Sequence, residues 1–188
     1  TVAKNLAIIR ERIERAAKHV GREPREITLL AAAKTVDIKR IQEAVKAGVK
    51  VLGENYVQEA KKKIKDLERR KKDIRWHFIG HLQKNKVKDT ILLFDMIETV
   101  DSVGLAKELN KRVQEKLDVL VQVNLAKEKT KGGVNEQEAL SLAREIAKLE
   151  NLSLKGLMTI PPFFENPEMS RPYFTELRRL AEKIRREA

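Results

Sequence analysis

Short apolar segments alternate with longer amphipathic ones along this chain, and that alternation is what most constrains its fold. Apolar runs that fit buried strands lie at residues 27–33, 49–52, 75–80, 95–100, 117–124 and 153–160. Patterns typical of helices lie at residues 2–18, 37–46, 56–72, 84–93, 102–116, 136–149 and 169–186. Short apolar strands that alternate with helices predict parallel βα units, with helices covering both faces of the sheet. We therefore expect an α/β fold made of six such units.

Capping residues support several of these helices. Asp37 and Ser102 stand directly before helical periodicity, where their side chains can accept hydrogen bonds from the first turn. Asn135 stands before another helix with Glu138 three residues later, and Gly48 stands where a helix is expected to end.

The strand count leaves two architectures open. A closed parallel barrel usually has eight strands in about 250 residues, whereas this chain supplies six predicted strands in 188 residues. Either the sheet is open and doubly wound, or the last two units of a TIM-type (β/α) barrel are missing from this sequence. No break in composition divides the chain, so we expect a single domain over residues 1–188.

The charge composition limits the function classes. The chain has 40 Lys and Arg against 28 Asp and Glu, a net charge of +12. The basic runs at 61–72 and 178–186 contain interleaved acidic residues and no stacking aromatics, so they fit solvated helix faces better than a nucleic-acid surface. A basic nucleic-acid-binding protein is thus an alternative but a disfavoured one. With no cysteine and no long apolar run, we expect a cytoplasmic protein without disulfides or a membrane span.

Candidate ligand-binding residues are expected at the carboxyl ends of the strands, where both architectures bind ligands. Lys34 ends the first strand after six apolar positions of seven. A lysine that projects from an apolar surface is poorly solvated, and poor solvation disfavours its charged ammonium form. We therefore expect this side chain to be a nucleophilic amine. The alternative is an exposed lysine that closes a strand.

Other strand ends carry polar or small residues. Asn55 follows the second strand and is either a ligand-facing amide or the N-cap of the next helix. His77 and His81 flank Gly80, but no carboxylate or cysteine nearby completes a metal site, so we expect none. The loop at 127–133 contains Lys131 and two glycines and could bind an anion, although it lacks a Walker pattern.

Five segments together resemble a known family. LLAAAKT, VLGENYVQEA, WHFIGHLQKNK, VLVQVNLAKEKTKGGV and LKGLMTIPPFFENPEMSRPYFTEL closely resemble the YggS/PROSC family of pyridoxal phosphate homeostasis proteins. The order and spacing match from the first helix to the last.

The resemblance implies a fold like the N-terminal barrel of alanine racemase and pyridoxal 5′-phosphate (PLP) as cofactor. It implies a Schiff base on Lys34 and no established catalytic turnover, with a role in buffering PLP or delivering it to apoenzymes. By motif correspondence, the pocket would be lined by Asn55, His77, His81, Asn124 and Met158. Lys131 matches a family lysine and is a candidate second amine for the cofactor.

The resemblance also implies two further strands past Ala188, with a Ser-rich loop and an Arg-x-Gly segment that grip the phosphate. We therefore expect an incomplete C-terminus, and a monomer for the full-length family form. A PLP-dependent racemase or decarboxylase is the enzyme alternative. It is disfavoured because such racemases need a second base, typically a tyrosine from another domain, and this chain offers only Tyr56 and Tyr173.

Overall fold

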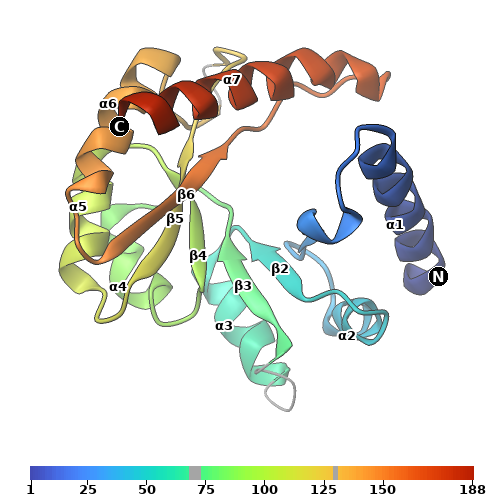
Figure 1. Cartoon of the computed structure of the whole chain (residues 1–188). Helices are drawn as coiled ribbons and strands as arrows, with labels where there is room; N and C mark the ends of the chain where they lie inside the picture. The colour runs from blue at the N-terminus through green and yellow to red at the C-terminus, as the bar shows by residue number, and fades with distance from the viewer. Residues whose placement is uncertain (68–72, 129–130) are drawn as a thin grey trace. The chain divides into compact units, whose positions relative to one another are not determined.

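Strands and helices alternate along the chain, as Figure 1 shows for the computed structural model, which describes residues 1–67, 73–128 and 131–188. The strands are β1 (Leu30–Ala32), β2 (Val51–Glu54), β3 (Arg75–Phe78), β4 (Met96–Val100), β5 (Leu117–Gln122) and β6 (Leu152–Met158). The α-helices are α1 (Val2–His19), α2 (Ile38–Lys46), α3 (Val57–Asp66), α4 (Val87–Thr90), α5 (Val103–Arg112), α6 (Glu136–Ala147) and α7 (Arg171–Glu187). Short 3-10 turns occur at η1 (Pro24–Glu26), η3 (Lys84–Lys86) and η4 (Pro167–Ser170).

The sheet has six strands in the order β1-β2-β3-β4-β5-β6. The pairs β1–β2, β4–β5 and β5–β6 are parallel, with Leu30 opposite Val51 and Gln122 opposite Met158. A doubly wound sheet would reverse its strand order at a switch point. This sheet does not, so the barrel-like α/β fold expected from the sequence is confirmed and the doubly wound alternative is wrong.

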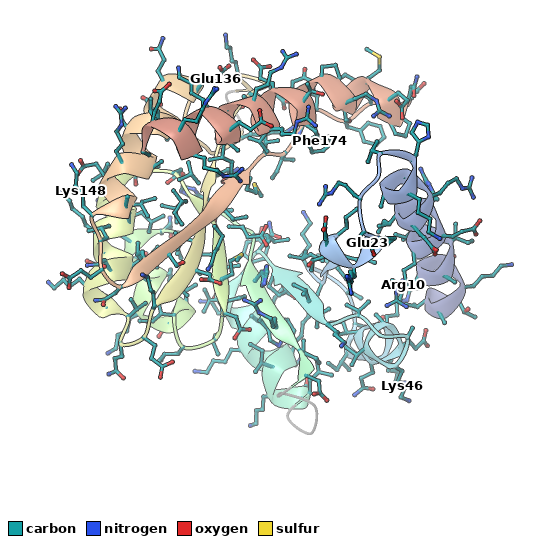
Figure 2. The ribbon with its side chains drawn as sticks, viewed as in Figure 1. Arg10, Glu23, Lys46, Glu136, Lys148 and Phe174 are labelled. Atoms are coloured by element: carbon teal, nitrogen blue, oxygen red, sulfur yellow. The ribbon has the colours of Figure 1, made fainter. Side chains whose placement is uncertain are left out.

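The described chain divides into two compact units, Thr1–His77 and Phe78–Ala188. In the first unit, α1 contacts α2, and α3 contacts β2. Leu52 and Ala60 are buried where α3 covers β2. Arg10, labelled on α1 in Figure 2, donates to the carbonyl oxygen of Ala47 at 2.6 Å and so ties α1 to the end of α2.

The core of the second unit lies between its strands and α4, α5 and α6. Phe78 and Phe94 meet edge to face, with ring centroids 5.2 Å apart. Small side chains let the helices approach closely, and Ala106, Ala139 and Ala143 are fully buried there. These contacts pack β5 and β6 against the helices of the second unit, and β4 pairs with β5.

The predicted elements are all present; most are shorter than expected, whereas α1 extends one residue further and β2 is shifted to Val51–Glu54. The helix expected at 56–72 is α3, which spans Val57–Asp66, and residues 68–72 lie outside the described residues. The strand expected at 27–33 pairs only over Leu30–Ala32. Among the described helices, none is both long enough and apolar enough to cross a membrane.

Candidate functional site

Lys34 lies in a tight turn directly after β1. The amide of Val36 donates to the carbonyl oxygen of Ala33 at 3.0 Å, which makes Lys34 and Thr35 the central residues of a four-residue turn. We call residues 33–36 the Lys34 turn. The side chain of Lys34 is exposed to solvent. The expectation of apolar, desolvated surroundings is therefore wrong. Within the described residues, Lys34 Nζ forms no hydrogen bond or ion pair.

Hydrogen bonds from β2 and α3 fix the backbone of this turn. The amide of Ala33 donates to the carbonyl oxygen of Gly53 at 2.7 Å. The carbonyl oxygen of Ala33 accepts from Lys63 Nζ, also at 2.7 Å. The amide of Thr35 donates to Glu59 Oε2 at 3.3 Å. The backbone is therefore held on both sides of Lys34.

A buried ion pair lies beneath the turn. Lys63 Nζ is 2.6 Å from Glu54 Oε1, and the exposed fractions of the two side chains are 12% and 0%. Burial raises the pKa of the Glu54 carboxyl, and the hydrogen bond and charge of Lys63 oppose that rise. Glu59 adds a second carboxylate 3.4 Å from Lys63 Nζ. We call Glu54, Glu59 and Lys63 the turn anchor.

Asn55 follows β2, next to the turn anchor in sequence. The residue that caps α3 is Tyr56, which makes no side-chain capping bond, so the alternative that Asn55 is the N-cap is wrong. Asn55 Oδ1 is buried and has no hydrogen-bond partner in the part of the chain that the structure describes. A buried amide oxygen without a donor is costly, so this atom is suited to accept from a ligand.

The two histidines differ in their surroundings. His77 is buried in β3, at 7% exposure, which fits a structural residue. His81 belongs to the second unit and is exposed, with Nδ1 3.4 Å from Asp101 Oδ2. Residues 1–67, 73–128 and 131–188 contain no group of three His, Asp or Glu side chains that could hold a metal ion.

Asn124 organises the loop after β5 in the second unit. Its Nδ2 donates to the carbonyl oxygens of Glu128 at 2.9 Å and Lys131 at 3.1 Å. Gly133 has a φ of +115°, and a Cβ there would lie 3.0 Å from the amide nitrogen of Asn124. The returning chain thus needs glycine to pass so close to Asn124. Residues 129 and 130 of this loop lie outside the described residues.

Lys131 and the end of β6 complete the loops of the second unit. Lys131 Nζ is 2.9 Å from Glu128 Oε1 and donates to the carbonyl oxygen of Pro161 at 3.0 Å. Its amine is therefore engaged, unlike that of Lys34. Met158 ends β6 half-buried, and its carbonyl oxygen accepts from the amide of Val123 at 2.8 Å.

The site residues predicted from the sequence fall into two groups. Lys34, Asn55 and His77 lie in the first unit; those in the second are His81, Asn124, Lys131 and Met158. Sequence reasoning missed Lys63. One signal could have found it: it lies between Ala60 and Ile64, which are buried on α3, so its stem starts on the covered face of the helix.

The comparisons with known proteins cover nearly the whole chain. The family of the alanine racemase N-terminal domain matches residues 5–188. The pyridoxal phosphate homeostasis protein of Aquifex aeolicus is 43% identical over 190 residues, which cover 98% of this chain and 81% of that protein. That of Pasteurella multocida is 36% identical over 188 residues, with 98% and 81% covered.

Solved structures agree with these relatives. The crystal structure of an unknown protein from Bifidobacterium adolescentis is 34% identical and superposes with a TM-score of 0.87 over 95% of this chain and 77% of that one. PipY of Synechococcus elongatus, solved with PLP bound, is 28% identical with a TM-score of 0.86 over 100% of this chain and 84% of that one. This chain therefore belongs to the family of the alanine racemase N-terminal domain and, within it, to the pyridoxal phosphate homeostasis proteins.

Proposed function

We propose that this chain binds pyridoxal 5′-phosphate through Lys34 and acts as a carrier or regulator in pyridoxal phosphate homeostasis. Its relatives are named for that role, and PipY was solved with PLP bound. Bound PLP offers an aldehyde carbon to which a primary amine can add. Lys34 Nζ would form a C=N bond to that carbon, with the aldehyde oxygen leaving as water.

One observation carries the choice of Lys34. Lys34 can be compared with two other lysines, Lys63 and Lys131, whose amines are already committed. Lys63 Nζ is held by Glu54 and the carbonyl oxygen of Ala33, and Lys131 Nζ by Glu128 and the carbonyl oxygen of Pro161. Lys34 Nζ has no such partner in the described part of the chain. Unlike the amines of Lys63 and Lys131, it can react without breaking a hydrogen bond.

Other residues fit an anionic aromatic ligand. Asn55 Oδ1, which lacks a donor among the described residues, could accept from a hydroxyl or protonated ring nitrogen. The net charge of +12 favours an anion such as the phosphate group. The roles toward the cofactor of His77, His81, Asn124, Lys131 and Met158 stay predictions.

We propose that the chain has no catalytic turnover of its own. A racemase of this fold needs a base opposite the lysine, and the chain has two tyrosines. Tyr173 lies against Phe164, with ring centroids 6.0 Å apart, and Tyr56 is 59% exposed. Neither is held toward Lys34 by a hydrogen bond that the structure gives. Incubation with L- and D-amino acids should leave their enantiomeric ratio unchanged, and racemisation above a Lys34→Arg blank would overturn this part of the proposal.

The partners would be cytoplasmic apoenzymes that need PLP. The exposed Lys34 supports this, because an amine open to solvent can release its ligand as well as capture it. Transfer can be followed as the recovered activity of a PLP-free transaminase added to the loaded chain. Recovery no faster than with an equal amount of free PLP would argue for a regulatory role instead of a carrier.

The attachment site can be tested directly. The chain is incubated with PLP, reduced with borohydride and digested, and the labelled peptides are identified by mass spectrometry. We expect the label on Lys34 and none in Lys34→Arg, which keeps the charge but cannot condense. Lys131→Arg is the matched control and should keep its label on Lys34. A label chiefly on Lys131 or on surface lysines would overturn the proposal.

A further inference from the structure

Thr35, the residue after Lys34, has a backbone conformation that its side chain disfavours. Its φ is +60°, and it occupies a turn position where glycine or asparagine is usual. A β-branched residue in this region is strained, and the conformation persists only where the surrounding structure over-determines it. Contacts from outside residues 33–36 must therefore hold the Lys34 turn in this conformation.

Two residues of the turn anchor hold the backbone of the turn, and both lie on α3. Lys63 and Glu59 lie one turn apart on α3, and they contact the backbone on opposite sides of Lys34. Lys63 Nζ donates to the carbonyl oxygen of Ala33 at 2.7 Å, while Glu59 Oε2 accepts from the amide of Thr35 at 3.3 Å. These two contacts leave the backbone of Lys34 little freedom to rotate.

Burying Glu54 does not favour the stability of the fold. Its side chain is completely buried, and its Oε2 has no hydrogen-bond partner within the described residues. Replacing a buried ion pair by apolar residues of similar size is often neutral or stabilising, so a buried pair is weak evidence for stability. Glu54 does, however, fix the position of Lys63 Nζ at 2.6 Å.

We propose that Lys63, held by Glu54 and assisted by Glu59, is a positioning residue that sets the direction in which the Lys34 amine leaves the turn. This inference rests on the proposed function of Lys34. The anchor acts through the backbone, since it contacts residues 33 and 35 and not the amine itself. Its loss should therefore slow capture of PLP without making Lys34 less exposed.

The first experiment compares capture rates, followed by the rise of visible absorbance when PLP is mixed with the apo chain. Lys63→Met keeps the aliphatic stem and removes the donor, and Lys62→Met removes an exposed charge from the same helix as the matched control. We expect Lys63→Met to slow capture at least about tenfold, because small misplacements of a reacting group cost up to 100-fold. Lys62→Met should match the wild type.

A second pair of variants separates positioning from stability. Lys63→Met leaves Glu54 buried without its partner, which by itself destabilises the fold. The double variant Glu54→Gln/Lys63→Met has no uncompensated charge, so its unfolding midpoint should recover toward the wild-type value. Its capture rate should stay low, because the carbonyl oxygen of Ala33 still lacks its donor. Recovery of both quantities would overturn the positioning role.

A third measurement needs no cofactor. Hydrogen exchange of the Thr35 amide in the apo chain should be faster in Glu59→Ala than in the wild type, whereas Glu59→Gln, which keeps an acceptor oxygen, should restore slow exchange. If the wild type itself carries no label on Lys34, the proposed function fails and this inference falls with it. If the wild type is labelled there and the folded anchor variants capture PLP at its rate, only this inference fails.

Discussion

Thr35 stores backbone strain beside the proposed cofactor lysine, and one substitution can release it. Asparagine tolerates a positive φ better than threonine does, because its short polar side chain can bond to the local backbone. We expect Thr35→Asn to raise the free energy of unfolding by about 0.5–1 kcal/mol, part of the strain cost of such a residue. Urea unfolding of the two proteins measures the difference.

Thr28→Asn is the matched control for this change. Thr28 is also exposed and lies in the first unit, but its φ is not positive. It should show no gain in stability. An equal gain at both positions would mean that asparagine helps for a reason unrelated to the φ of residue 35.

Glu54 should give the protein a characteristic pH dependence. Its pKa is raised, chiefly by burial, so the folded state holds this proton more tightly than the unfolded state does. Glu54 therefore contributes stability that is fully present below the ordinary glutamate pKa of about 4.3 and is lost as the pH rises through the raised pKa.

Glu54→Gln removes this titration. The free energy of unfolding of the wild type minus that of Glu54→Gln should fall as the pH rises from about 4 toward neutrality. Urea titrations of both proteins at a series of pH values give this difference. A difference that grows with pH would show that the ion pair with Lys63 outweighs the burial of Glu54, and that its pKa is lowered.

At the scale of elements, α6 shows how local sequence sets a helix start. Asn135 Oδ1 accepts from the amides of Gln137 and Glu138, each at 3.0 Å, and Glu138 Oε2 accepts from the amide of Asn135 at 3.1 Å. The helix that follows this capping box begins at Glu136, labelled in Figure 2, directly after the loop that Asn124 organises.

Asn135→Ala removes one half of that box. Loss of such a cap typically costs about 1 kcal/mol, so we expect a decrease of that size in the free energy of unfolding. Gln137→Ala changes an exposed neighbour on the same turn and should be nearly neutral. A cap variant as stable as Gln137→Ala would show that the sheet, and not the cap, sets the start of α6.

Elements with local signals were predictable from the sequence. Asp37, Ser102 and Asn135 all act as N-caps whose side chains accept from the first turn, as expected. Strand boundaries were less predictable, because pairing depends on a neighbour distant in sequence. Leu29 continues the apolar run but lies before the first paired residue of β1. The βα rhythm predicted six parallel units, but it left the order of the strands open between a barrel and a doubly wound sheet.

The candidate site was predictable only in part. The position of Lys34 at the end of β1 follows from the apolar run before it. The turn anchor could not be predicted in the same way, because Lys63 is one of several lysines in the sequence of a charged helix. Its partner Glu54 is nine residues away and on a different element. Only folding brings β1, β2 and α3 together, so the sequence can place Lys63 on the covered face of α3 but cannot show its contact with the carbonyl oxygen of Ala33.

For the whole molecule, the net charge of +12 should govern how fast an anionic ligand arrives. A positive field steers anions toward a protein and raises their association rate by tenfold or more, roughly. Salt shortens the reach of that field, from about 30 Å at 0.01 M to about 10 Å at 0.1 M ionic strength. The basic runs were interpreted as solvated helix faces. Their charges still contribute to this effect, because long-range attraction depends on the summed charge.

We therefore expect the capture rate of PLP to fall several-fold, roughly, between about 0.01 M and 0.1 M salt. Pyridoxal has the same aldehyde and lacks the phosphate, so it is the matched ligand and its capture rate should change little. Stopped-flow absorbance at constant pH measures both rates. Equal salt dependence for the two ligands would mean that the phosphate is not attracted by the field, and that salt acts on the reactivity of the Lys34 amine itself.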